Sequence, residues 1–305
     1  MKELNDESTG ADLGLAPNLG TVSAGPDPDP APVPVPVPAP DPAPVPAPVP
    51  APAPIEGAYS RIRMRVGDEG LQRLQGAKVV VVGLGAVGSF ATEALARSAI
   101  GTLRLVDFDN LQPSNLNRQL YALKETMGCF KADVAAQRVK SINPACNVQG
   151  MRVFFDATQV DAVLEGMDWC VDAIDSLNSK VELLAACVAR NIPVVSAMGA
   201  ADRTDPMLLR ISDISETDGC PLARLVRKRL RKRGVQSGPI AIWSTQPAVE
   251  VPPELQEEPD ESADQGRRGR IRRPLPSLAP MPGIFGLAAA NVVIMDIVGG
   301  RKTPS

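Results

Sequence analysis

The sequence predicts an α/β protein with a Rossmann-like, doubly wound sheet that is parallel in its first half, a C-terminal extension and a disordered, proline-rich N-terminus. Three observations support this fold class. The valine-rich run at 78–82 leads directly into a G-x-G-x-x-G turn and an alanine-rich helical pattern. Short apolar runs then alternate with amphipathic helical stretches as far as residue 199. In the N-terminal part, by contrast, every second residue from Pro26 to Pro54 is proline.

Residues 1–57 are expected to stay unfolded. Each X-Pro pair in the tract 26–54 disfavours helix and removes one backbone hydrogen-bond donor, so the tract should be extended, in the polyproline II conformation. Such a segment serves as a semi-rigid spacer or as a docking site for aromatic-lined grooves. We favour a spacer, because no basic residue marks the tract as an SH3-type ligand.

The next part of the chain, 58–251, is expected to fold as one domain. A helical segment, 59–75, carries Arg61, Arg63 and Arg65 and precedes the first strand. Apolar and β-branched runs mark the strands, and Asn143-Pro144 ends one of the helices because proline cannot continue it. After the strand at 78–82 we expect strands at 102–106, 148–154, 169–174 and 193–197 and helices at 89–98, 130–142, 158–165 and 177–190.

Beyond the fifth strand the alternation stops. Residues 206–214 are expected to form one more strand, and 222–234 a basic helix. The segment 252–273 is acidic, then basic, and almost without apolar residues, which predicts a disordered insertion. The final stretch, 274–300, contains an apolar helix at 285–298 that should pack back on the domain.

Composition and charge limit the chemistry. The net charge of -3 over 305 residues gives no overall attraction to nucleic acid, so any basic surface must be local. The chain has no histidine, which excludes Ser-His-Asp hydrolysis, histidine metal sites and histidine acid–base catalysis. Aspartate, lysine, arginine, cysteine and backbone amides are left to carry any reaction.

Cysteine usage and hydropathy indicate the compartment. The five cysteines are scattered and never form C-x-x-C, which argues against a four-cysteine zinc site and fits a reducing compartment. No apolar run reaches the roughly 18 residues of a membrane span. The acidic, arginine-poor N-terminus resembles neither a secretory signal nor a transit peptide. We therefore expect a cytoplasmic location, with a mitochondrial one as the alternative.

The glycine turn, with Gly83, Gly85, Ala86 and Gly88, is typical of a phosphate site. A strand, a tight turn and a helix N-terminus together present backbone N–H groups to the phosphates of a nucleotide. Asp107 follows Gly88 by 19 residues, about where an acid that binds ribose stands in a dinucleotide dehydrogenase. On these features alone, NAD would be the first choice.

Further polar residues favour a triphosphate instead. The acid is doubled as Asp107-x-Asp109, and Asn115 and Arg118 follow in the pattern N-x-x-R-Q. The planar guanidinium of Arg118 suits phosphate oxygens. The structural alternative is a surface salt bridge between Arg118 and Asp109. Lys131, at a helix start, would reach the same crevice as a point charge, or it is simply a solvated helix residue.

A second acid, Asp175, ends the strand 169–174. A carboxylate at this place is able to hold Mg²⁺ that bridges phosphates. The alternative is that Asp175 or Ser176 caps the helix that follows.

Taken in order, these motifs resemble the ubiquitin-activating-enzyme-like superfamily, the ThiF/MoeB/HesA group. The shared pattern is an N-terminal arginine, G-x-G-x-x-G, D-x-D, N-x-x-R-Q, a lysine at a helix start and D-x-x-D. It falls here on Arg61, Gly83, Gly85, Gly88, Asp107, Asp109, Asn115, Arg118, Gln119, Lys131, Asp172 and Asp175. The resemblance implies ATP-dependent adenylation of a carboxylate.

The resemblance also implies roles for single residues. Asp107 would bind the ribose, Arg118 and Lys131 the phosphates, and Asp175 the Mg²⁺. Arg61 would reach across a homodimer into the ATP site of the partner. The other expected ATP-binding positions are Gly83, Gly85, Ala86, Gly88, Asp109 and Asn115.

Within the superfamily the chain is most similar to the tRNA threonylcarbamoyladenosine dehydratases. Ala173-Ile-Asp175-Ser176 continues to Lys180 in the pattern A-I-D-S-x-x-x-K, and the zinc cysteine pairs of many relatives are missing. Gln246 stands where that branch has the glutamate of an S-T-E motif, which removes a charge. The branch implies adenylation of the threonyl carboxylate, attack by the carbamoyl group, ring closure and release of AMP, with net loss of water.

Two other functions stay open at this point. An enzyme that adenylates the C-terminus of a ubiquitin-like or sulfur-carrier protein would share the ATP site. A scaffold that binds nucleotide and presents the proline tract to partners is the other alternative. Cys220, which precedes Pro221, is the candidate for an acceptor thiol, although an inert thiol is the interpretation we favour.

The basic helix at 222–234 is the expected contact with tRNA. Its alternative is an ordinary solvated basic face. The basic residues in this helix are Arg224, Arg227, Lys228, Arg229, Arg231, Lys232 and Arg233.

Overall fold

A computed structural model describes residues 57–247 and 275–299, which belong to one compact unit, Pro50–Ser305. The proline-rich tract 26–54 and the expected insertion 252–273 lie outside the described residues. Within the described part, seven strands form one sheet in the order β3-β2-β1-β4-β5-β7-β6. Only β6 runs antiparallel to its neighbour, β7, in that part of the chain. The strands are β1 Lys78–Val82, β2 Thr102–Val106, β3 Asn147–Met151, β4 Trp169–Asp172, β5 Val194–Ala197, β6 Leu209–Asp213 and β7 Ile240–Ser244.

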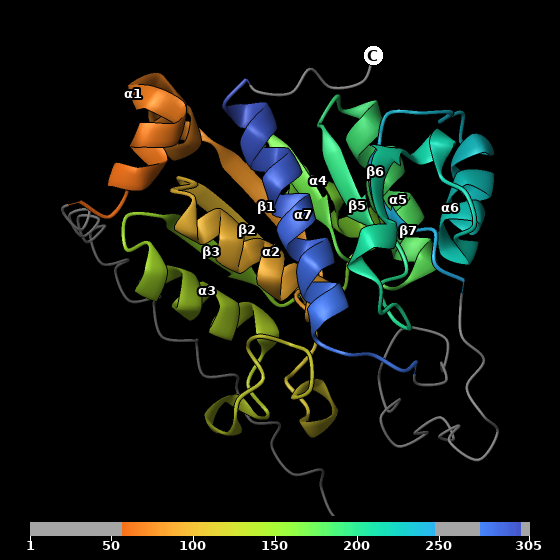
Figure 1. The fold of residues 1–305 in the computed structure, drawn as a ribbon, viewed down its shortest axis with the longest axis horizontal. Coiled ribbons are helices and arrows are strands. Elements are labelled where there is room, and N and C mark those ends of the chain that lie inside the picture. The colour runs from red at the N-terminus through yellow and green to blue at the C-terminus, as the bar shows by residue number, and fades with distance from the viewer. Residues whose placement is uncertain (1–56, 248–274, 300–305) are drawn as a thin grey trace, which may run out of the picture. The chain divides into compact units, whose positions relative to one another are not determined.

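Helices cover both faces of the sheet, as a doubly wound fold requires (Figure 1). α2, α3 and α7 pack on one face, and α4, α5 and α6 on the other. The helices are α1 Ser60–Gly76, α2 Ala86–Arg97, α3 Lys131–Ile142, α4 Val160–Leu164, α5 Leu177–Ala189, α6 Pro221–Arg231 and α7 Pro280–Ile297. The α/β fold class expected from the sequence is confirmed.

The central strand β1 explains why the valine run is continuous. Val79 and Val81 belong to the core under α2, α3 and α7, whereas Val80 and Val82 belong to the core under α4, α5 and α6. A strand that is buried on both faces has no polar side to alternate with its apolar one. The glycine turn follows the carboxyl end of β1, so the buried strand fixes the position of the turn.

The last helix, α7, packs closely on α2. A Cβ atom built on Gly286 would lie 2.3 Å from the carbonyl oxygen of Val87, so glycine is required at this crossing. The indole nitrogen of Trp169 donates a 3.0 Å hydrogen bond to Asp296 at the other end of the helix. α7 is also long and apolar enough to cross a membrane by length and composition, but half of it is buried in this packing.

Several boundaries differ from the expected ones. The strand at 148–154 ends at Met151, and the helix at 158–165 is α-helical only over Val160–Leu164. The last helix begins at Pro280, since proline fits the first turn, where no backbone N–H is needed. One strand, β7, was not predicted from the sequence; its five residues lie between β5 and β6 in the sheet.

Candidate functional site

The glycine turn joins β1 to α2 at the carboxyl edge of the sheet. Gly83 has φ of 91°, and a Cβ atom at this position would lie 2.7 Å from the carbonyl oxygen of Ala173. A Cβ atom on Gly88 would lie 1.8 Å from the carbonyl oxygen of Gly83. α2 begins at Ala86, directly after Gly85, so its first backbone N–H groups face out of the turn. The turn is a tight cradle with the positive end of a helix at its mouth.

Asp107, the first residue after β2, ties this turn to the next strand. Its Oδ2 accepts a 2.7 Å hydrogen bond from the N–H of Leu84, and its Oδ1 accepts one of 2.9 Å from the N–H of Asp109. The side chain is buried, and burial raises the pKa of the carboxyl group, while the charge of Lys131 opposes the rise. A carboxylate beside a phosphate-binding turn is placed to accept hydrogen bonds from the hydroxyl groups of a ribose.

Asp109 and Lys131 form an ion pair beside Asp107. The ammonium nitrogen of Lys131 lies 3.0 Å from Oδ2 of Asp109, and the lysine side chain is only 7% exposed. The backbone repeats the link, since the N–H of Lys131 donates to the carbonyl of Asp109 at 3.0 Å. Lys131 is therefore not a solvated helix residue: α3 begins with a buried cation that faces the carboxyl end of β2.

Arg118 does not pair with Asp109, so the surface salt bridge considered as its alternative is absent. Its guanidinium donates instead to the carbonyl of Ser114, at 2.8 Å, and to Oδ1 of Asn117, at 2.7 Å. In the described part of the chain no carboxylate pairs with it. Its positive charge is held in place and, among the described residues, is not compensated by a carboxylate, as an anion site requires.

The loop that carries Arg118 is packed against the glycine turn. Asn115 is buried and accepts the N–H of Gln112 at 3.0 Å. The N–H of Leu120 donates to the hydroxyl of Ser89, in the first turns of α2. Gln119 is 8% exposed, and its Oε1 has no hydrogen-bond partner in the described residues. Its amide nitrogen lies 3.7 Å from the place of a Cβ atom on Gly85.

Asp175 lies in the turn between β4 and α5, at the same edge of the sheet. Its side chain is exposed, and Ser176, the N-cap residue of α5, makes no side-chain capping bond. The turn touches the glycine turn directly, because Ala173 is the neighbour that a Cβ on Gly83 would meet. Asp175 therefore lies on a turn that adjoins the glycine turn, at the carboxyl edge of the sheet.

Arg61 is not brought to this edge within one chain. It is exposed on α1, whose last residue, Gly76, stands just before β1. Figure 1 shows α1 at the amino end of the strands, opposite the glycine turn. Gly67, with φ of 74°, kinks the helix between Arg61 and the sheet.

The edge fits ATP. Gly83 and Gly88 allow the turn to pack tightly before the first turn of α2, and the buried Oε1 of Gln119, which has no partner among the described residues, is an acceptor for a ligand N–H or hydroxyl. Among the described residues no group of three or more acids or cysteines could hold a metal ion alone. One carboxylate with substrate phosphates is the usual way in which proteins hold Mg²⁺, and Asp175 suits that arrangement.

The ThiF family model matches residues 59–304. The chain belongs to the ThiF family. Its relatives in that family include the tRNA threonylcarbamoyladenosine dehydratase of Bacillus subtilis, 38% identical over 79% of this chain and 94% of that protein. The protein of the same name from Escherichia coli is 40% identical over 54% of this chain and 62% of its own length.

Solved structures of the ThiF family agree. The crystal structure of Escherichia coli TcdA in complex with ATP superimposes with a TM-score of 0.68 and 30% identity. The match covers 79% of this chain and 94% of that one. Its complex with AMP gives the same score and coverage.

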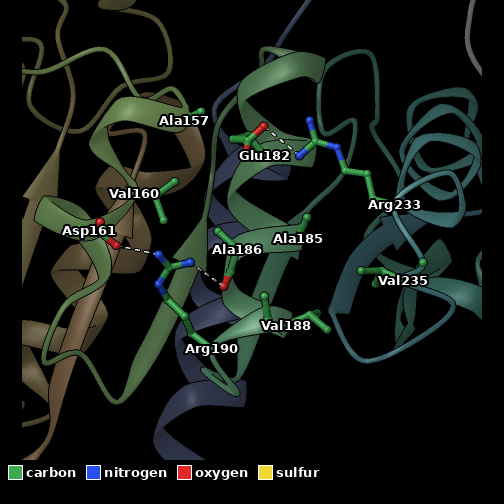
Figure 2. Close-up of a pocket in the computed structure, with 12 residues that line it drawn as sticks. Ala157, Val160, Asp161, Glu182, Ala185, Ala186, Val188, Arg190, Arg233 and Val235 are labelled. Atoms are coloured by element: carbon green, nitrogen blue, oxygen red, sulfur yellow. Dashed lines mark hydrogen bonds and ion pairs between the residues drawn. The ribbon is translucent and has the colours of Figure 1, made fainter.

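Two hollows in the described part of this ThiF protein lie away from the glycine turn. One, of about 570 Å³, lies between α4, α5 and the segment after α6. Figure 2 shows that two ion pairs cross its walls, Asp161 with Arg190 and Glu182 with Arg233. The other lies at the amino ends of β1, β2 and β3. Because both arginines in the first hollow are neutralised, it has no net attraction for an anion.

The basic residues of α6 and of the segment just after it fall into two sets, apart from Lys232, the exposed C-cap residue. Arg227, Arg229 and Arg233 are engaged with Thr217, Asn178 and Glu182, and so fasten the helix to its neighbours. Arg224, Lys228 and Arg231 are exposed at helical spacing and bond to no described residue. We call these last three the basic stripe. The sequence alone did not separate the two sets.

Gln246, Cys146 and Cys220 have structural roles and not catalytic ones in this fold. Oε1 of Gln246 accepts the N–H groups of Thr204, at 2.9 Å, and Asp205, at 3.0 Å. Its Nε2 also donates to the hydroxyl of Thr204, at 3.1 Å, so the amide holds the turn from both of its ends. A glutamate carboxylate would keep the two acceptor contacts. Cys220, the N-cap residue of α6, is buried, and burial raises the pKa of Cys146 to about 11, so neither is placed as a reactive thiol.

Proposed function

We propose that this ThiF protein is an ATP-dependent tRNA threonylcarbamoyladenosine dehydratase. The observation that carries the proposal is its 38% identity to the Bacillus subtilis enzyme of that name over 94% of that enzyme's length. The site geometry supports it, because the glycine turn, Asp107 and Lys131 meet at one edge with no histidine needed. Positioning and charge neutralisation are the main demands of adenylation.

The proposed reaction has two steps. An oxygen of the threonyl carboxylate attacks the α-phosphorus of ATP, and the bond to pyrophosphate breaks. The carbamoyl group of the same nucleoside then attacks the acyl carbon, the ring closes and AMP leaves with the carboxylate oxygen. The nucleoside thereby loses the elements of water, and that oxygen atom departs on AMP.

Each charged residue has a proposed part in the first step. Arg118 neutralises the phosphate oxygens, since Ser114 and Asn117 fix its charge before substrate arrives. Lys131, which Asp109 holds in place, donates a hydrogen bond to a phosphate oxygen. Asp107 accepts the ribose hydroxyls. Asp175 would hold Mg²⁺, which draws charge from the phosphates when it is bound.

We place tRNA on the basic stripe of α6. Three exposed cations at i, i+4 and i+7 form one row along the helix, as backbone phosphates would require. The stripe lies on the same sheet face as α5, whose amino end adjoins Asp175.

A homodimer would complete the site with Arg61. α7 is apolar on all sides, yet only half of it is buried, and Leu287 on its outer side is 48% exposed. α1 adjoins the end of α7, where Arg73 donates to the carbonyl of Val298. A second copy packed on this outer side of α7 would cover an apolar surface and bring its own α1 nearby. We expect a cytoplasmic enzyme.

The test of the reaction uses the full chain with ATP, Mg²⁺ and tRNA that carries threonylcarbamoyladenosine. AMP release together with loss of one water from the nucleoside, by mass spectrometry, is the expected result. AMP release only with a ubiquitin-like or sulfur-carrier protein would favour the alternative function, which related adenylyltransferases share. Binding of ATP without either reaction would favour a scaffold. Arg118→Ala should abolish turnover, whereas Lys124→Ala, an exposed cation of the same loop, should not.

The dimer has its own test. Arg61→Ala and Asp175→Ala chains are each expected to be inactive alone. If Arg61 serves the site of the partner, a mixed dimer contains one intact site, and mixing the two inactive chains restores part of the activity. Failure to regain activity, in a mixture shown by mass spectrometry to contain mixed dimers, would contradict this role of Arg61.

A further inference from the structure

One charged cluster behind the site has no part in the reaction as described. Lys180, on α5, is fully buried, as are Asp172 at the end of β4 and Ser196 on β5. The ammonium nitrogen of Lys180 lies 2.6 Å from Oδ2 of Asp172. A buried ion pair seldom adds stability over apolar residues of the same volume, because desolvation of both charges offsets their attraction. Its presence calls for a different explanation.

Every polar group in the cluster is satisfied. The three ammonium hydrogens of Lys180 have three acceptors: Asp172, the Ser196 hydroxyl at 3.2 Å and the Ala197 carbonyl at 3.0 Å. The hydroxyl of Ser196 donates in turn to Oδ2 of Asp172 at 2.5 Å. A fully satisfied buried network allows one arrangement only, so the cluster fixes β4, β5 and α5 relative to one another.

The cluster also fixes the turn that carries Asp175. Asp172 stands just before the turn, and Lys180 lies in the first turn of α5, which follows it, so the ion pair joins the two elements that flank the loop. Oδ1 of Asp172 accepts the N–H of Ile174, inside the turn, at 3.0 Å. The N–H of Ala173 donates to the carbonyl of Val82 at 2.9 Å, which ties the same turn to the glycine turn.

We propose that Lys180 is a positioning residue: through Asp172 it holds the β4–α5 turn so that Asp175 faces the Mg²⁺ that accompanies ATP. The proposal rests on the proposed nucleotide site, but not on the identity of the carboxylate that is adenylated. Partners that orient a metal ligand typically change metal affinity by about 10-fold to 100-fold when they are removed. The expected defect therefore lies in the metal dependence of ATP binding.

The test measures binding, not turnover. The affinity of the full chain for ATP is measured by calorimetry with and without Mg²⁺. The variant is Lys180→Met combined with Asp172→Leu, which removes both charges together and so leaves no unpaired buried charge. Lys180→Met alone would leave the carboxylate of Asp172 buried without its cation, so this variant serves only as a comparison. Ser196→Ala, which keeps the ion pair, is the milder variant if the double one does not fold.

A matched control separates positioning from stability. Leu183 is fully buried on the same helix, and its apolar side chain has no part in the hydrogen bonds of the cluster. Leu183→Ala should lower Tm and leave the effect of Mg²⁺ on ATP affinity unchanged. The double variant also leaves the Ser196 hydroxyl and the Ile174 N–H without their partner, so its Tm should fall as well. Unlike Leu183→Ala, it should lose the effect of Mg²⁺ by about 10-fold or more, with ATP affinity in the absence of Mg²⁺ preserved. Ser196→Ala should lose part of that effect.

Two results would overturn the proposal. One is a folded double variant, or a folded Ser196→Ala variant, in which Mg²⁺ strengthens ATP binding as in the wild-type chain. The other is a wild-type chain whose affinity for ATP does not depend on Mg²⁺. Neither depends on tRNA, so failure of the dehydratase assay would leave this proposal standing, and its own failure would leave that assay unaffected.

Discussion

Gly88 lies against Gly83 so closely that a Cβ atom on Gly88 would come within 1.8 Å of the Gly83 carbonyl oxygen. The contact is between backbone atoms on both sides, and no side chain is able to move away. The spacing of the two glycines in the sequence is therefore a condition for the turn to exist.

Gly88→Ala should destabilise the whole domain. Overpacking at a backbone contact costs about 1–3 kcal/mol, and each kcal/mol lowers Tm by roughly 2–4 °C in a domain of this size. Gly85→Ala is the matched control, because its Cβ would meet only the amide of Gln119, at 3.7 Å. Calorimetry should show a lower Tm for the first variant only. An unchanged Tm in Gly88→Ala would mean that the turn relaxes more than the structure allows.

Lys131→Met should separate activity from stability. Removal of one preorganised cation near a reacting phosphate costs about 100-fold to 1,000-fold in kcat. Asp109 is 27% exposed, so water compensates its lost partner and Tm should change little. Rates of AMP release measure the effect, with Lys124→Met as the exposed control. A fall in kcat of less than about threefold would mean that Lys131 does not bind the phosphates.

How much of this site was predictable from sequence depends on the kind of contact. The glycine turn, Asp107 and the start of α3 at Lys131 depend on local spacing, and the structure brings all of them to one edge. The cluster of Lys180, Asp172 and Ser196 joins three elements, and pairing of β4 with β5 is needed to see it. Strand β7 was not predicted, because a run of five residues is too short to show the periodicity of a strand or a helix.

The roles of Gln246 and of the basic residues near α6 also depend on contacts between distant parts of the chain, which the sequence does not reveal. Replacement of glutamate by Gln246 looked like a lost charge in the acceptor half of the site. The structure shows an amide that accepts hydrogen bonds from two backbone N–H groups and donates one to the Thr204 hydroxyl, a structural role within one turn. Likewise, seven basic residues near α6 looked equivalent, but only a three-dimensional structure separates those that fasten the helix from the basic stripe.

Gln246→Glu should therefore be close to neutral. A carboxylate keeps both acceptor contacts to Thr204 and Asp205, whereas Gln246→Ala removes them at about 0.5–1.5 kcal/mol each. Urea denaturation of the two variants beside the wild-type chain makes the comparison. If both variants lose stability equally, the negative charge itself is not tolerated in this turn.

Asp107 predicts a pH dependence of stability. Burial raises the pKa of Asp107 in the folded chain above its ordinary value of 3.8. An acid whose folded pKa is raised favours the folded state below pH 3.8, and that contribution is lost as the pH rises through the folded pKa. The wild-type chain should therefore lose stability relative to Asp107→Asn, which cannot titrate, between pH 4 and pH 7. Urea denaturation at both pH values gives the difference; a gain over this range would reverse the sign assigned to burial.

The basic stripe of α6 predicts a salt-dependent defect in tRNA use. Arg224→Ala with Lys228→Ala removes two exposed cations, and each lost phosphate contact reduces the slope of log affinity against log salt by roughly 0.7–0.9. KM for tRNA should rise while KM for ATP and Tm stay unchanged. Arg73→Ala with Arg97→Ala removes the same charge from α1 and α2 and should leave tRNA binding intact. An equal rise of KM for tRNA in the two double variants would mean that tRNA binding depends on the overall charge of the protein and not on this helix.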